Sequence, residues 1–106
     1  MRVGILQLNP TIGDIDGNTQ RLIDAAHASN ADLLVTPELV ISGYPPRDLL
    51  LCSGFVEACE HAVKRIANSV SRTILVGHPR IEQTTERVRN SISVIEGGEV
   101  IAVVDK

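Results

Sequence analysis

The chain has 106 residues, a formal net charge of -3 and a hydrophobic fraction of 43%, which is typical of one small globular domain. It lacks a basic block interleaved with aromatic residues, so we expect no nucleic-acid partner. It also lacks the roughly 18 uninterrupted apolar residues of a membrane span, so we expect no membrane partner. The N-terminus enters a strand pattern directly, without signal-peptide anatomy, which predicts a cytoplasmic protein.

The first third of the chain predicts a strand, a helix and a second strand. Residues 2–8 are rich in aliphatic side chains and predict a strand. Apolar residues recur at helical spacing over residues 18–29, and either Asp16 or Asn18 could cap the start of that helix. Residues 32–36 form a continuous apolar run, as expected of a strand buried on both faces.

The segment that follows, TPELVISGYPPRDLL from Thr36 to Leu50, carries the main candidate for chemistry. Glu38 comes directly after a predicted strand, and ligand sites in α/β proteins collect beyond the carboxyl ends of strands. A carboxylate at such a place is a candidate general base. Asp48 is expected to cap a short turn after the two prolines.

The second half predicts one helix and three strands. We expect His78–Pro79 to end the first of these strands and residues 80–88 to form a loop. The Gly97–Gly98 pair predicts a tight hairpin between the last two strands. The predicted elements are the helix at 53–70 and the strands at 73–77, 90–95 and 100–104.

The cysteines and histidines do not form a recognisable site in the sequence. Cys52 and Cys59 are seven positions apart, too far on a helix for a disulfide, and predict two reduced, partly buried thiols. The three histidines, His27, His61 and His78, are expected to be solvated or to act as caps. Their spacing offers no metal-ligand pair, so no metal is expected.

These elements predict an α/β fold in which strands joined by helices pair in parallel and a final hairpin adds an antiparallel edge. No repeat or linker divides residues 1–106, which read as one unit. The last predicted strand stops just before Lys106 and leaves an exposed sheet edge. Exposed edges favour pairing with another chain, so we expect a homo-oligomer.

The Glu38 segment resembles the nitrilase, or carbon–nitrogen hydrolase, superfamily. More narrowly, SGYPPRDLL after Pro37-Glu38 is similar to the N-terminal glutaminase domain of glutamine-dependent NAD synthetases. Asn9-Pro10 and the Asn90-Ser91 strand with its Gly-Gly hairpin resemble the same branch. The resemblance implies a four-layer α-β-β-α sandwich, of which residues 1–106 would form the N-terminal half, a mixed sheet with helices on one face.

The resemblance also implies a Glu-Lys-Cys triad that hydrolyses glutamine. Glu38 matches the catalytic glutamate, Lys106 matches the lysine by position, and Tyr44 matches a tyrosine beside the glutamine pocket. The family nucleophile lies downstream of the lysine, so we expect residues 1–106 alone to be inactive. Neither Cys52 nor Cys59 matches it.

In the family, glutamine is the small-molecule substrate, and the ammonia serves a C-terminal synthetase domain that amidates deamido-NAD. We expect no cofactor on residues 1–106, and we expect ATP and magnesium in that synthetase domain. Two alternatives remain open. The parent protein could be another nitrilase-superfamily amidase or carbamoylase, or the chain could be a non-catalytic assembly module.

Overall fold

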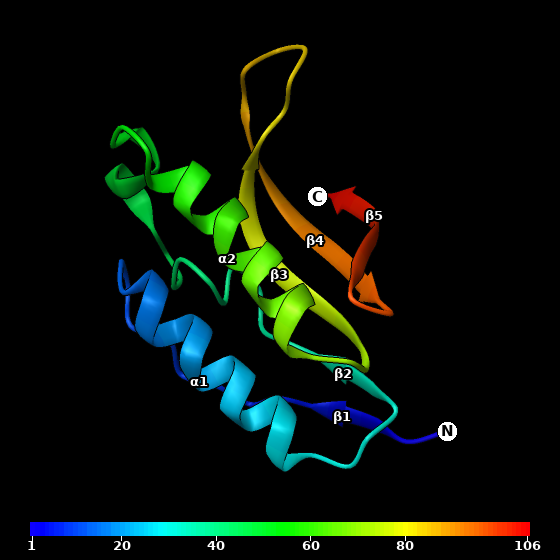
Figure 1. The fold of residues 1–106 in the computed structure, drawn as a ribbon. Helices are drawn as coiled ribbons and strands as arrows, with labels where there is room; N and C mark the ends of the chain where they lie inside the picture. Colours follow the sequence, from blue (N-terminus) through cyan, green and yellow to red (C-terminus); the bar gives the residue numbers. More distant parts are fainter.

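The computed structural model describes all of residues 1–106 as one five-stranded sheet with two α-helices (Figure 1). The strands lie in the sheet in the same order as in the sequence. In chain order the elements are β1 (Val3–Ile5), α1 (Ile15–Ala28), β2 (Leu33–Val35), the 3-10 helix η1 (Arg47–Leu51), α2 (Phe55–Ser69), β3 (Thr73–Ile81), β4 (Val88–Glu96) and β5 (Glu99–Asp105).

The sheet is mixed, as the sequence predicts. β1, β2 and β3 pair in parallel, because α1 and α2 each return the chain to the end of the sheet at which these strands begin. β3, β4 and β5 pair antiparallel, and the β4–β5 hairpin turns at Gly97 and Gly98, whose φ angles are 61° and 80°. These positive angles favour glycine, so the predicted hairpin turn is confirmed.

Helix α1 begins three residues before its predicted start. Asp14 is the N-cap, and its carboxylate accepts a 3.1 Å hydrogen bond from the Gly17 backbone N–H. The expectation that Asp16 or Asn18 caps this helix is therefore wrong. Asn18 is instead buried inside the first turn, where its side chain binds loop backbone. In η1, the expected cap from Asp48 is also missing, since the N-cap is Pro46 without a side-chain bond.

Two strands, β1 at one edge of the sheet and β3 at its centre, differ in length from the predictions. The strand predicted at 2–8 is only Val3–Ile5 long, because its partner β2 ends at Val35. Conversely, β3 continues through His78–Pro79 to Ile81, so the expected strand end is wrong, and the loop predicted at 80–88 is present but spans only residues 82–87. The nine-residue β4 provides a full-length antiparallel partner, and Pro79 pairs with Asn90 in that register.

The core lies between the sheet and the two helices, which sit side by side on one face (Figure 1). Alternate strand residues point into it, as pleating requires. No tryptophan is available, so the core is aliphatic. Its fully buried side chains include Leu22, Leu34, Ile66, Ile74, Val76 and Ile95. Neither helix is both long and apolar enough to cross a membrane.

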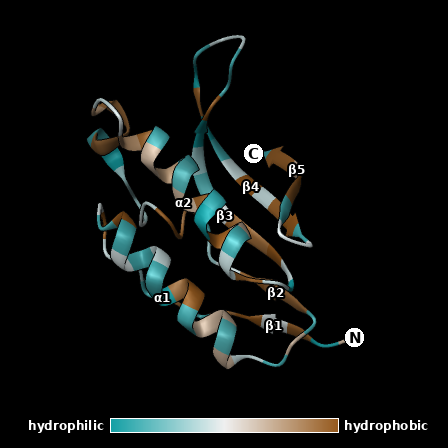
Figure 2. Cartoon of the chain, in the orientation of Figure 1, coloured by the Kyte–Doolittle hydropathy of each residue, from teal (hydrophilic) through white to brown (hydrophobic).

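The opposite face of the sheet is apolar and uncovered. Val3, Ile5, Ile92 and Val104 are exposed there, and Ile92 and Val104 are partners in the β4–β5 register. All seven residues of β5 are exposed, although most of that strand is hydrophobic (Figure 2). The side chain of Glu38 opens onto this face, at the end of the sheet where β2 and β5 finish.

Candidate active site around Glu38

The loop that carries Glu38 leaves β2 and crosses over β3. Thr36 starts this crossing, because its hydroxyl donates to the Leu75 carbonyl at 2.9 Å and accepts from the Gly77 N–H at 3.1 Å. A Cβ on Gly77 would lie 2.5 Å from the Pro37 carbonyl oxygen, which real Cβ atoms essentially never do. A glycine at position 77 therefore allows the loop to lie directly on the sheet.

Buried side chains hold the loop after Glu38 in place. Val40 and Ile41 are fully buried beneath it. The buried Ser42 hydroxyl donates to the Gly43 carbonyl at 3.0 Å, and the Gly43 N–H donates to the Leu39 carbonyl at 2.9 Å. A loop anchored by apolar side chains and satisfied backbone groups presents its carboxylate in a fixed direction.

Two side chains from the final hairpin meet Glu38. Lys106 Nζ lies 3.1 Å from Glu38 Oε1, and Asn90 Nδ2 donates to the same oxygen at 2.6 Å. The Lys106 backbone N–H also donates to the Asn90 carbonyl at 2.8 Å. The structure thus brings Glu38 and Lys106 together, and Asn90 contacts both.

This arrangement keeps the carboxylate ionised. The hydrogen bond from Lys106, followed by the one from Asn90, lowers the pKa of Glu38 below its ordinary value of 4.5, and partial desolvation opposes the shift. The pair is solvent-accessible, with the Lys106 side chain 77% exposed, so its contribution to stability is small. An ionised carboxylate beside a cation can accept a proton and also orient the ammonium group.

The polar group lies at one end of an apolar cavity of about 340 Å³, a size suited to a small molecule. Val35, Leu75, Ile92 and Val104 line its sides. A larger hollow of about 700 Å³ lies between the start of α1 and α2, away from Glu38. Exposed charged side chains line that hollow, and neither Glu38 nor Lys106 is among them, so the Glu38 cavity is the better candidate site.

The other residues singled out in the sequence lie outside the cavity. Tyr44 is 61% exposed and does not line the cavity. Cys52 is exposed at the end of η1, so the expectation that both thiols are partly buried on one helix is wrong. Cys59 lies fully buried in α2, on the core side of the sheet, and burial raises its pKa to about 12.

The expectation for the histidines is wrong for His78, which is buried in β3 rather than solvated. Its Nδ1 faces the Pro79 carbonyl at 3.0 Å, and its Nε2 faces the Ser93 hydroxyl at 2.7 Å. Because a carbonyl only accepts, Nδ1 carries the proton and Nε2 accepts from Ser93. Burial lowers the pKa of His78, so the ring is neutral and structural.

Asn90 is the site residue that the sequence did not reveal. Asparagine is uncommon inside strands, and this was the one available signal, but its partner Glu38 lies 52 positions away. No group of three or more His, Cys, Asp or Glu side chains is arranged to hold a metal ion.

The chain matches known proteins over its whole length but spans only about a fifth of the curated relatives. It is 42% identical to the glutamine-dependent NAD(+) synthetase of Synechocystis sp., over 92% of this chain and 19% of that protein. The corresponding enzyme of Thermotoga maritima is 36% identical, over 100% of this chain and 19% of that protein. No protein-family model matches.

Solved structures agree with these relatives. The glutamine-dependent NAD+ synthetase of Acinetobacter baumannii, in complex with adenosine diphosphate, superimposes with a TM-score of 0.90 and 32% identity over 99% of this chain and 20% of that one. A nitrilase-superfamily amidase of Nesterenkonia AN1 gives 0.84 and 27% over 100% and 42%. One mutant of that amidase carries an acetamide moiety bound covalently at its active-site cysteine. The chain is therefore similar to the N-terminal portion of the glutamine-dependent NAD(+) synthetases and shares the fold of a nitrilase-superfamily amidase over the matched region.

Proposed function

We propose that residues 1–106 supply the general base and the lysine of a glutaminase site in a glutamine-dependent NAD(+) synthetase. The observation that carries this proposal is the contact between Glu38 and Lys106, 3.1 Å apart at the end of an apolar cavity. The relatives named NAD(+) synthetase supply the choice of glutamine as the amide substrate.

In the proposed reaction, Glu38 takes the proton from a cysteine thiol, and the thiolate attacks the side-chain amide carbon of glutamine. Lys106 donates a hydrogen bond to the oxyanion of the tetrahedral intermediate. The C–N bond then breaks, the leaving nitrogen takes up the proton and departs as ammonia, and a thioester remains. Water hydrolyses the thioester to glutamate and regenerates the thiol. Tyr44 is proposed to contact the bound glutamine from its exposed position on the same loop.

The nucleophile of this reaction is not one of the two cysteines of residues 1–106. Cys59 is buried among core side chains under α2, and its raised pKa of about 12 keeps it as a thiol. Cys52 does not line the Glu38 cavity. We therefore propose that a segment beyond residue 106 of the parent polypeptide provides the cysteine, as in the amidase relative with its active-site cysteine. Residues 1–106 alone should release no ammonia from glutamine.

The released ammonia is proposed to amidate deamido-NAD in a C-terminal synthetase portion that uses ATP and magnesium. The relatives that match this chain are about five times longer than the matched region, and one related structure holds adenosine diphosphate. Residues 1–106 are proposed to bind no cofactor themselves.

The test compares two activities of the protein encoded by the full open reading frame. Glu38→Gln should lower glutamine-dependent NAD formation by at least about 100-fold, the usual contribution of a general base, and should leave ammonia-dependent NAD formation unchanged. Glu82→Gln, which removes a carboxylate outside the cavity, should change neither activity. Unchanged glutamine-dependent activity in the Glu38→Gln protein would contradict the proposal.

The likeness to the Nesterenkonia amidase, which is described with fluoroacetamide and with acrylamide, favours a second candidate, an amidase that acts on simple aliphatic amides. Ammonia release from acetamide without NAD formation would support it over the synthetase. The non-catalytic alternative predicts no ammonia release from any amide by the full protein.

Self-association remains a proposal of ours, supported by the exposed strand β5 and the apolar outer face. Light scattering on residues 1–106 should detect an assembly larger than one chain, and a monodisperse monomer would contradict it.

A further inference from the structure

The position of Lys106 depends on the end of an unprotected strand. β5 is the edge of the sheet, and all seven of its residues are exposed. The Lys106 side chain reaches Glu38 from a backbone that is held by one hydrogen bond, to the Asn90 carbonyl. The end of an exposed edge strand frays unless it is tied down, so this contact needs a separate anchor.

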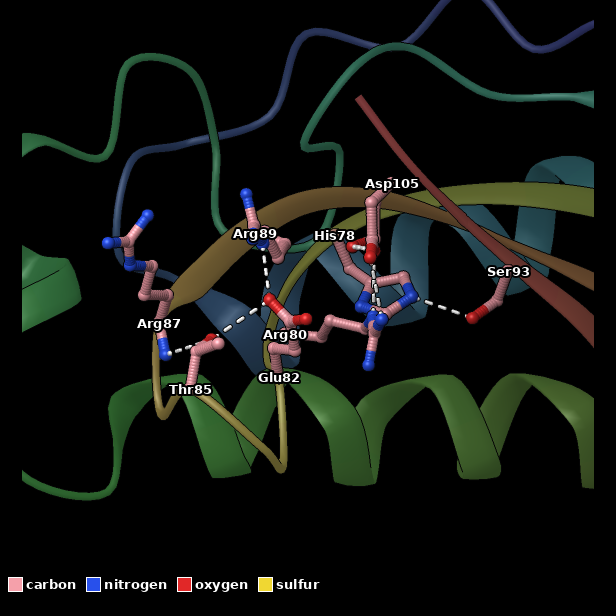
Figure 3. Close-up of polar contacts among 9 residues, drawn as sticks. His78, Arg80, Glu82, Thr85, Arg87, Arg89, Ser93 and Asp105 are labelled. Carbon is pink, nitrogen blue, oxygen red and sulfur yellow. Dashed lines mark hydrogen bonds and ion pairs between the residues drawn. The ribbon is translucent and has the colours of Figure 1, made fainter.

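Asp105 provides a tie on the other face of the sheet, because neighbouring strand residues point to opposite sides. Its Oδ1 accepts from Arg80 Nε at 2.8 Å, and its Oδ2 accepts from Arg80 Nη2 at 2.6 Å. The Ser91 hydroxyl donates a third bond to Oδ1 at 2.7 Å. Arg80 belongs to β3, Ser91 to β4 and Asp105 to β5, so the three bonds join three strands. Figure 3 shows Arg80 and Asp105 facing each other.

We propose that Arg80, Ser91 and Asp105 form a positioning clamp that fixes the end of β5 and thereby holds Lys106 against Glu38. Ser91 and Asp105 line the cavity, but the hydrogen bonds of the three clamp residues join them to one another and not to Glu38, so these are positioning residues. The catalytic importance of the clamp rests on the proposed function, whereas the positioning of Lys106 stands on the geometry alone.

The geometry of the clamp distinguishes it from an ordinary surface ion pair. Exposed pairs usually contribute little, because two flexible side chains must be ordered. The planar guanidinium of Arg80 instead meets the carboxylate through two parallel bonds, which adds orientation as well as attraction. The side chains of Arg80 and Asp105 are only 26% and 30% exposed. The third bond from Ser91 fixes the carboxylate against rotation.

The same region offers a matched control. Arg89 and Glu82 form a second ion pair, 2.7 Å long, that joins the start of β4 to the loop after β3 (Figure 3). Its exposure and its shortest N–O distance are similar to those of the Arg80–Asp105 pair, but it has one hydrogen bond instead of two and does not include β5. Removing it should therefore leave the end of β5 in place.

The experiment measures two NMR quantities on residues 1–106: hydrogen exchange of the Lys106 amide and the titration of the Glu38 carboxyl carbon. Asp105→Asn and Arg80→Gln should each speed Lys106 exchange about tenfold, the equivalent of one lost charge-assisted hydrogen bond. The pKa of Glu38 should rise toward 4.5 as Lys106 moves away. Glu82→Gln should change neither quantity.

A charge exchange separates positioning from general stability. Arg80→Asp combined with Asp105→Arg should restore slow exchange and the low pKa of Glu38, although each single reversal loses both. Ser91→Ala, a milder change, should give an intermediate effect. An unchanged rate of Lys106 amide exchange in Asp105→Asn would overturn the clamp. Global unfolding of both Asp105→Asn and Ser91→Ala would also overturn it, because the three residues would then stabilise the whole fold and not the end of β5 in particular. A catalytically unimportant Lys106 in the full protein would overturn the proposed function and leave the clamp intact.

Discussion

Glu38 and Lys106 lie 3.1 Å apart although 68 positions separate them in the sequence. The strands that carry them, β2 and β5, are three strand spacings apart in the sheet, which is about 14 Å. The loop of Glu38 covers part of this distance by crossing β3 at Gly77, and the long Lys106 side chain covers the rest by crossing β4 at Asn90. The contact between Glu38 and Lys106 therefore requires both crossings.

The crossing at β4 predicts a titration change. Replacing Asn90 with Leu removes the 2.6 Å donor to Glu38, so the pKa of Glu38 should rise toward 4.5. Asn90→Asp should raise it further, since a second carboxylate at that distance disfavours ionisation. Carbon-detected NMR titration of Glu38 measures both effects. Asn68→Asp on the exposed side of α2 is the control, and an unchanged titration in Asn90→Asp would contradict the contact.

The crossing at β3 predicts a loss of stability. In Gly77→Ala the added methyl group would lie 2.5 Å from the Pro37 carbonyl oxygen and 2.7 Å from the Leu39 nitrogen. Both atoms are backbone, so the loop must move, and overpacking of this kind costs about 1–3 kcal/mol. Urea denaturation gives the free energy of unfolding. Gly54→Ala, with open space around the new methyl group but a φ of 81°, should cost less; equal costs would contradict the close crossing.

The sequence predicted those parts of the site that depend on local chemistry. The apolar run at Leu33–Val35 followed by Pro37 placed Glu38 at a strand end, and Gly97–Gly98 identified the hairpin that returns the chain to Lys106. Both signals act over a few residues, where proline and glycine fix the backbone directly.

Contacts that depend on strand register could not be predicted in this way. The contacts of Asn90, Arg80 and His78 depend on how β3 and β4 are aligned. Pro79 in β3 led to a predicted strand that was too short. A period-two pattern shows that a residue alternates between faces, but it does not show which residue lies opposite. The buried role of Asn18 was missed for a related reason, because its partners lie in two separate loops.

Asn18 is predicted to be a large contributor to stability. Its side chain accepts from the Thr11 N–H at 2.8 Å and donates to the Thr11 and Ile41 carbonyls at 2.8 and 2.9 Å. Asn18→Ala leaves the buried Ile41 carbonyl and the part-buried Thr11 groups without these partners, which costs about 2–3 kcal/mol. Urea denaturation should show this loss, and the exposed helix variant Asn68→Ala should stay within about 0.5 kcal/mol of the parent chain. A near-neutral Asn18→Ala would contradict the bridging role.

Acid should weaken the fold through Asp105. Hydrogen bonds from Arg80, then from Ser91, lower the pKa of Asp105 from 3.8 to about 2. A carboxyl whose folded pKa is depressed contributes stability that is present above its unfolded value and is lost as pH falls through the folded value. The free energy of unfolding should therefore fall between pH 3.8 and about 2. Denaturation at several pH values should show a shallower fall in Asp105→Asn, and an identical pH profile would count against the Arg80–Asp105 pair.

The two cysteines should differ sharply in reactivity. Cys52 is exposed, whereas Cys59 is fully buried and its pKa is raised to about 12 by desolvation. The thiolate is the reactive form, so iodoacetamide near pH 8 should add one group to the native chain and two to the unfolded chain, as intact mass reports. Cys52→Ser should block native labelling, and Cys59→Ser should not affect it. Rapid labelling of Cys59 in the native chain would show that α2 opens readily, and would reopen the question of whether that thiol can act as a nucleophile.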